Sequence, residues 1–189
     1  MIKSSSFASD LSPEYPVLGF LYLTPLHGYE LHRRLGLHLN EIWHLPQNQT
    51  YNILKRLEKN GMIAAERRSE GSRPERACFS LTPAGQAHFE RWLAAPTPTS
   101  ARAIRMEFIT RLFFAARISE TLTGRILAEQ QAALQADLAR LRARLAATPP
   151  EQPYNRLGLD LRIRQLESVL TWIHDTADSP IEPVQEQQP

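Results

Sequence analysis

Residues 47–59 combine amide and basic side chains with leucines at spacings that suit burial on one helix face. This pattern is typical of a helix that contacts DNA. The first three positions carry amides, each of which offers a hydrogen-bond donor and an acceptor, the pair that adenine presents in the major groove. The basic residues that follow suit contacts with phosphate oxygens. Base contacts are therefore expected in the first turn of this helix. The residues of this segment expected at DNA are Gln47, Asn48, Gln49, Thr50, Tyr51, Lys55 and Arg56. For Tyr51 the alternative is packing within the protein.

A second basic segment follows directly. Met62–Glu66 and Ala77–Leu81 are short apolar stretches that predict two strands, and the glycine and proline between them predict a turn. Arginines lie in this turn, so Arg73 and Arg76 are expected to contact DNA at the tip of a basic hairpin. The alternative is that both are solvated charges.

Positive charge is concentrated in this part of the chain. The protein has 189 residues and a net charge of only +2, and beyond residue 96 eleven arginines balance eleven acidic residues. From Lys55 to Arg76, by contrast, seven basic residues accompany four acidic ones. A local excess of this kind favours a polyanionic partner, and double-stranded DNA is the partner expected.

Two helices are predicted before the amide-rich segment. An apolar run predicts the first at Tyr15–Leu23, where a following proline stops it. The second is predicted at Gly28–Leu35, with Gly36 as its terminator. Pro46 then suits the first turn of the third helix, and Gly61 suits the residue that follows its end.

Three helices followed by a hairpin predict a winged helix-turn-helix domain, in which the hairpin is called the wing. In this fold the third helix enters the major groove and the second helix braces it. Thr82 and Pro83 predict the start of one more helix after the wing. We expect this domain at residues 15–95, after a flexible segment at residues 1–14, with the proline-rich residues 96–100 as its boundary.

Only helices are predicted beyond that boundary, in a helical dimerisation domain at residues 102–177 followed by a disordered tail at residues 178–189. One helix is expected at Ile104–Arg117, and two long helices follow, the first at about Ser119–Ala147. Leucines and isoleucines in the long helices are three and four residues apart, which predicts coiled-coil-like apolar seams. Periodicity alone allows these seams to close within one chain or between two copies. The fold class is thus mainly α with a two-stranded wing.

Taken together, these segments resemble the PadR family of transcriptional regulators. The resemblance runs from Val17 through Leu93 and continues more loosely to about Ala177. It rests on the Gly-Tyr-Glu-Leu motif at residues 28–31, on Trp43 with residues 49–51, 54–58 and 61–63, and on residues 73–74 and 79–85. The chain departs from the family pattern at Pro46 and Asn48, where many members have serine and glycine, and at Thr50, where most have an aliphatic residue. The DNA sequence that it binds is therefore expected to differ from that of other members.

The resemblance implies a homodimeric repressor that binds an inverted repeat and is released by a small, commonly aromatic, effector. It adds Tyr29 to the residues expected at DNA. An effector site is expected at Trp43, Phe108 and Leu112, with packing in the core as the alternative. The residues expected in the dimer interface are Phe113, Leu134, Leu138, Leu141, Leu145, Leu166, Leu170 and Ile173.

Other chemistries find little support in the sequence. No apolar run approaches the ~18 residues that a membrane span needs, and the six histidines are scattered without metal-ligand spacing, so neither a membrane nor a cofactor is expected. A single cysteine, Cys78, fits a cytoplasmic protein and is expected to be inert, with a redox switch as the alternative. An enzyme ranks last because neither a glycine-rich phosphate loop nor a nucleophile elbow is present. A protein-interaction module without sequence-specific DNA binding ranks second.

Overall fold

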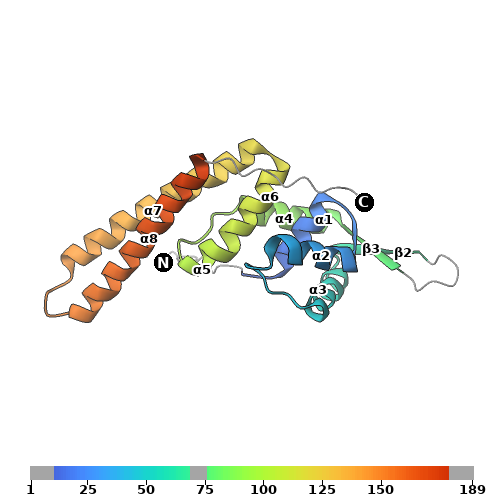
Figure 1. The fold of residues 1–189 in the computed structure, drawn as a ribbon, viewed down its shortest axis with the longest axis horizontal. Coiled ribbons are helices and arrows are strands. Elements are labelled where there is room, and N and C mark those ends of the chain that lie inside the picture. The colour runs from blue at the N-terminus through green and yellow to red at the C-terminus, as the bar shows by residue number, and fades with distance from the viewer. Residues whose placement is uncertain (1–10, 69–75, 179–189) are drawn as a thin grey trace, which may run out of the picture. The chain divides into compact units, whose positions relative to one another are not determined.

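In the computed structural model, residues 11–68 and 76–178 are described, and they fall into two compact units that divide between Ala95 and Pro96. Most of the predicted flexible segment at residues 1–14 and of the predicted disordered tail at residues 178–189 lies outside the described residues. At their described ends, Glu14 is the first residue of a helix and Asp178 is the last residue of another. Figure 1 shows a mostly helical chain in which one small antiparallel sheet accompanies the N-terminal helices. Within the described residues no helix is both long enough and apolar enough to cross a membrane.

The N-terminal unit is built from four helices, α1 (Glu14–Leu23), α2 (Gly28–Leu39), α3 (Gln47–Lys59) and α4 (Pro83–Ala94). Helix α1 lies at the centre, because it is apolar on nearly every side and buries seven consecutive residues, from Tyr15 to Leu21. Helices α2, α3 and α4 all contact α1, so its apolar surface is the common core on which the other three are positioned.

Three strands form the sheet, in the order β1 (Leu26–His27), β3 (Arg76–Leu81) and β2 (Ile63–Arg68). Strands β2 and β3 form the predicted hairpin, and Figure 1 shows them running side by side toward the segment at residues 69–75. Strand β1 was not predicted. Its two residues pair with Phe79 and Cys78, about fifty positions later, and the His27 ring is 3.1 Å from the Ala77 carbonyl oxygen.

Helix α2 continues past the glycine that was expected to end it. Gly36 is exposed and has no neighbouring atom within 4 Å of a built Cβ, so it lies on the solvent side of the helix. Leu35 and Leu39, 2% and 1% exposed, are four residues apart and are both buried in the core. Burial of Leu39 outweighs the cost of about 1 kcal/mol that a glycine adds to a helix interior, so the predicted terminus at Gly36 is wrong.

Thr82 joins the end of α3 to the start of α4. Its hydroxyl oxygen accepts from the Gly85 backbone N–H (3.1 Å), which is the predicted helix cap. The same oxygen lies 2.7 Å from the Gly61 carbonyl and 3.1 Å from that of Met62. Gly61 has φ +69°, the left-handed conformation expected of the residue after a helix end. These bonds hold α3 in place relative to the sheet and α4.

The C-terminal unit contains α5 (Ala101–Ala103), a π-helical segment η1 (Ile104–Phe108), α6 (Ile109–Ile118), α7 (Glu120–Ala147) and α8 (Pro153–Asp178). A continuous α-helix was predicted at Ile104–Arg117, where η1 and α6 now stand. The π-helical turn coincides with a buried ion pair, in which the Arg111 guanidinium donates to Glu107 Oε1 at 2.5 Å and to Thr97 Oγ1 at 3.2 Å. Both charged side chains are under 5% exposed, so each compensates the buried charge of the other.

The apolar seams of α7 and α8 pack against each other within one chain. The two helices are antiparallel neighbours, as Figure 1 shows, because the prolines at 149, 150 and 153 turn the chain between them. This arrangement corrects the predicted dimer interface, since most of its leucines and isoleucines are already covered by their own chain. The buried ones are Leu134, Leu138, Leu141, Leu166 and Ile173, while Phe113, Leu145 and Leu170 are half-buried.

Candidate nucleic-acid interface

Helix α3 has one buried face and one polar face. Thr50, Ile53, Leu54 and Leu57 are all buried, at most 2% exposed, and they occupy an arc of about 100° at 100° per residue. Four exposed residues occupy an arc of about 60° on the opposite side of the helix. In chain order they are Asn48, Asn52, Lys55 and Lys59, and they are called the polar stripe below.

The prediction that Thr50 contacts DNA is wrong in this structure. Its side chain is 0% exposed, and its hydroxyl donates to the Pro46 carbonyl oxygen at 3.4 Å. The same hydroxyl shares a hydrogen bond of 3.2 Å with Nδ1 of His32 on α2. Thr50 therefore connects α2 and α3 from inside the domain. A buried hydroxyl suits this position because the Pro46 carbonyl oxygen and the His32 ring both form hydrogen bonds with it.

Tyr51 and Gly28 lie in close contact where α3 meets the start of α2. Tyr51 is half-buried, and a Cβ atom at Gly28 would be 2.8 Å from its Cε1 and 3.3 Å from its hydroxyl oxygen. Tyr29, the next residue along α2, is 66% exposed. The structure thus brings Tyr29 and Tyr51 to the same end of α2 and leaves the first of them open to solvent, where an aromatic side chain can meet a sugar or phosphate.

Several arginines near α3 are bound to carboxylates of this domain. Arg56 Nε donates to Glu14 Oε1 at 2.5 Å, which joins the end of α3 to the start of α1. Arg33 and Arg34 both donate to Glu30, at 2.8 and 3.0 Å. The pKa of Glu30 is lowered to about 2, mainly by the Arg33 hydrogen bond. Arg56 is held at Glu14 through Nε, whereas Lys55 and Lys59 are exposed in the polar stripe.

The wing begins as predicted, and part of it lies outside the described residues. Register between β2 and β3 runs from Ile63 opposite Leu81 to Arg68 opposite Arg76, so both strands end at residues with basic side chains. Arg73, which was expected to contact DNA, belongs to the segment that the structure does not describe.

The residues expected at an effector are core residues. Trp43 is 6% exposed in the N-terminal unit, and Phe108 and Leu112 are 0% and 3% exposed in the C-terminal unit. Phe108 packs edge-on against Trp172 of α8, with ring centroids 6.3 Å apart. None of the three lines the pocket between α7 and α8, and all three are packed among core residues.

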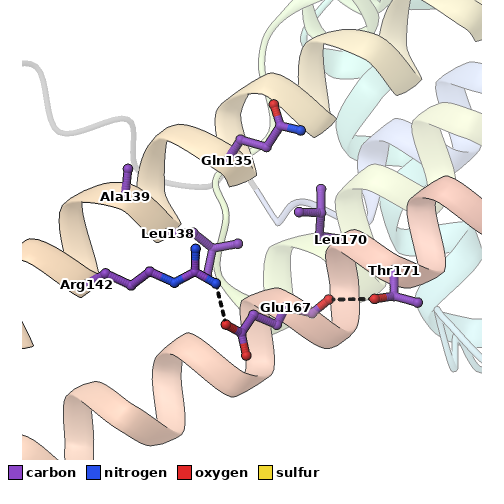
Figure 2. A pocket seen from close by; sticks show the side chains of 7 residues that line it. All are labelled: Gln135, Leu138, Ala139, Arg142, Glu167, Leu170 and Thr171. Carbon is purple, nitrogen blue, oxygen red and sulfur yellow. Dashed lines mark hydrogen bonds and ion pairs between the residues drawn. The ribbon is translucent and has the colours of Figure 1, made fainter.

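That pocket lies between α7 and α8 and has a volume of about 350 Å³. Figure 2 shows Leu138 and Leu170 inside it, and Arg142 reaching from α7 to Glu167 on α8. Arg142 donates to Glu167 Oε1 at 2.6 Å, and both side chains are partly exposed. The rest of the lining is Gln135, Ala139 and Thr171. Over the described part of the chain, no group of three or more His, Cys, Asp or Glu side chains is arranged to hold a metal ion.

Asn52 was not among the residues predicted to contact DNA, because the amides that cluster in the first turn of α3 were expected to make the base contacts. The signal was nevertheless present, since Asn52 is four residues after Asn48 and three before Lys55, and residues at these spacings share one face of a helix.

Comparisons with known proteins agree with this architecture. A family model described as the PadR-like family of transcriptional regulators matches residues 17–91. A second, described as the C-terminal part of virulence activator alpha, matches residues 104–179. The negative transcriptional regulator PadR of Bacillus subtilis is 26% identical over 128 residues, which are 68% of this chain and 70% of that protein. The probable transcriptional regulator Rv1176c of Mycobacterium tuberculosis is 32% identical over 73 residues, 38% of this chain and 39% of its own length.

Solved structures resemble the chain as well. A crystal structure of Bacillus subtilis PadR in complex with operator DNA aligns with 86% of this chain and 94% of its own, at 21% sequence identity and a TM-score of 0.44.

Proposed function

We propose that this chain, whose residues 17–91 match the PadR-like family of transcriptional regulators, is a homodimeric repressor whose α3 helices bind the two halves of an inverted-repeat operator. The observation that carries the proposal is the polar stripe of α3. Its two amides and two lysines lie directly opposite the face that packs on the core, which leaves them free to enter a major groove.

Repression is the direction of regulation that we propose. The relative that matches the larger part of this chain is named a negative transcriptional regulator. The C-terminal family match carries the name of an activator, and activation of a target gene is therefore the outcome that would overturn this part of the proposal.

The dimer is proposed to form through the outer face of α8. Tyr154, Leu157 and Leu161 are 86%, 62% and 58% exposed, and Trp172 is 39% exposed. At 100° per residue these four side chains fall within an arc of about 60° on one side of the helix. Isolated exposed apolar residues are ordinary, but an aligned set on one helix is typical of an interface. They replace the leucines that α7 and α8 bury against each other.

A small-molecule effector completes the proposal, and the pocket between α7 and α8 is its proposed site in place of the buried Trp43, Phe108 and Leu112. Its volume of about 350 Å³ is within the range of small-molecule sites, and its lining combines apolar with polar groups. A ligand there would contact both long helices, and through α8 it would act on the proposed dimer face.

The decisive experiment is the selection of bound duplexes from random DNA with the full-length protein, followed by affinity measurements on the selected sequence. We expect an inverted repeat whose half-sites are one or more helical turns apart. Lys59→Ala should weaken binding and reduce the slope of log affinity against log salt by about 1, the change expected when one phosphate is no longer neutralised. Arg162→Ala, an exposed arginine of α8, is the matched control and should leave the slope unchanged. Failure to select any duplex would favour the protein-interaction module instead.

A further inference from the structure

The residues of α3 differ in how far their side chains are already engaged within the protein. Thr50 is buried and hydrogen-bonded to α2, Tyr51 lies against Gly28, and Arg56 is bound to Glu14. Each of these side chains therefore has a structural partner that competes with a base or a phosphate. The polar stripe faces away from all of these partners, and Gln47 and Gln49 in the first turn are exposed as well.

The two asparagines of the polar stripe are not equivalent. Asn48 Oδ1 accepts from the Gln49 backbone N–H at 2.8 Å, so its acceptor serves the first turn of α3. Asn52 is exposed one turn later, and among the residues that the structure describes its amide makes no hydrogen bond. Asn52 consequently keeps both its donor and its acceptor for a partner outside the protein.

A free amide with both groups available matches adenine. In the major groove adenine presents the N7 acceptor beside the N6 donor, and an asparagine side chain can bond both at once. The oxygen of Asn48 already accepts one backbone hydrogen bond, which fixes the orientation of its amide and leaves it less able to bond both groups of adenine at once. The amide of Asn52 is not constrained in this way.

Asn52 lies in the polar stripe between Asn48 and the two lysines. Lys55 and Lys59 follow it by about 4.5 and 10.5 Å along the helix axis at 1.5 Å per residue. Charges at that distance beyond a base contact suit the phosphates of the strand that the helix passes as it leaves the groove.

We infer that Asn52 is the main specificity-determining residue of this chain and that it binds an adenine in each half of the operator. This inference rests on the proposed function, because it requires that α3 enters a major groove. It differs from the expectation drawn from sequence, which placed base contacts in the first turn of the helix.

The test combines a protein variant with a modified base. Wild-type protein and Asn52→Ala are titrated with the selected duplex, with all single-base variants of one half-site, and with duplexes that carry 7-deazaadenine, which lacks the N7 acceptor. Wild-type protein should bind about 5- to 150-fold more weakly when the cognate adenine is replaced or has no N7. Asn52→Ala should show little or no change at that one position and should keep its preferences at the others.

Two controls separate the inference from the proposed function. Lys59→Ala should weaken binding to every sequence by a similar factor and should keep the full 7-deazaadenine effect. Asn155→Ala, an exposed asparagine of α8, should behave as wild type. Asn52→Ala places the best helix former in an exposed helix position, so its melting temperature should match or exceed that of the wild type.

If DNA is bound but Asn52→Ala keeps the full adenine preference, the inference is overturned and the proposed function stands. If no variant binds DNA in a salt-dependent manner, the proposed function itself fails.

Discussion

The ring of Tyr51 lies so close to Gly28 that a Cβ atom on the glycine would be 2.8 Å from Tyr51 Cε1. This contact joins the first residue of α2 to α3, and it gives a physical reason for glycine in that place: only a residue without a side chain allows the ring to pack there. It also places Tyr51 against the protein on one side, so that at most its outer edge can meet DNA.

Gly28→Ala should move the Tyr51 ring and with it the first turn of α3. We expect a loss of about 1 kcal/mol in the free energy of unfolding, because overpacking of this kind is relieved in part by ring movement. Operator affinity should fall as well. In a Tyr51→Ala background the same substitution should have no cost, which chemical denaturation of the four proteins would measure. Gly36→Ala is the control, and it should stabilise by about 0.5–1 kcal/mol, since nothing lies within 4 Å of its Cβ.

Gly85→Ala should be far more harmful than Gly28→Ala. A Cβ at Gly85 would be 1.9 Å from the Met62 carbonyl oxygen, and backbone cannot move aside as a ring can. The same substitution would disturb the cap at Thr82, which accepts from the Gly85 N–H. We expect a loss of about 3 kcal/mol or more. A melting temperature close to that of the wild type would contradict the close contact between Gly85 of α4 and the Met62 carbonyl oxygen.

Glu30→Gln should lower stability near neutral pH but not in acid. The pKa of Glu30 is lowered to about 2 from an ordinary value of 4.5, so its carboxylate contributes stability above pH 4.5 that is lost as the pH falls toward 2. The difference between wild type and Glu30→Gln should therefore be full at pH 7 and should shrink in that window. Its size should stay below about 1 kcal/mol, because the ion pairs are partly exposed and screened.

Glu129→Gln provides the control for this pH series. Its carboxylate is 56% exposed and lies 3.9 Å from Arg125, so its removal should change stability little at any pH. Urea denaturation of the three proteins between pH 7 and pH 3 is the measurement. A Glu30→Gln deficit that stays constant over this range would contradict the link to ionisation.

The double variant Leu157→Glu and Leu161→Glu should convert the proposed dimer to a monomer. Both leucines lie outside the seam that joins α7 to α8, so the helical content of the unit should be kept. Sedimentation velocity and circular dichroism would measure the two quantities separately. Ala132→Glu, at an exposed position of α7, is the control and should leave the dimer intact. A wild-type protein that is monomeric at micromolar concentration would overturn the proposed interface.

Local signals predicted much of the DNA-binding unit. Proline before α3, Gly61 after it and Thr82 before α4 each act through backbone geometry or a single hydrogen bond within four residues, so they can be recognised without knowing the fold. Strand β1 could not be recognised in this way. It is two residues long and exists only because β3 supplies its partners from a distant part of the chain.

The sequence by itself determined that α3 is amphipathic, that its polar side carries amides followed by lysines, and that two long helices carry apolar seams. These properties depend on the spacing of residue types along the chain, which can be read without knowing the tertiary contacts. Tertiary structure decided which of the polar residues remain available. Thr50 and Arg56 look like DNA contacts in the sequence, but they are engaged by His32 and Glu14, which come from other helices. In the same way, burial of Leu134 and Leu166 depends on the chain folding back on itself, so only the fold could leave Asn52 and the outer face of α8 for partners.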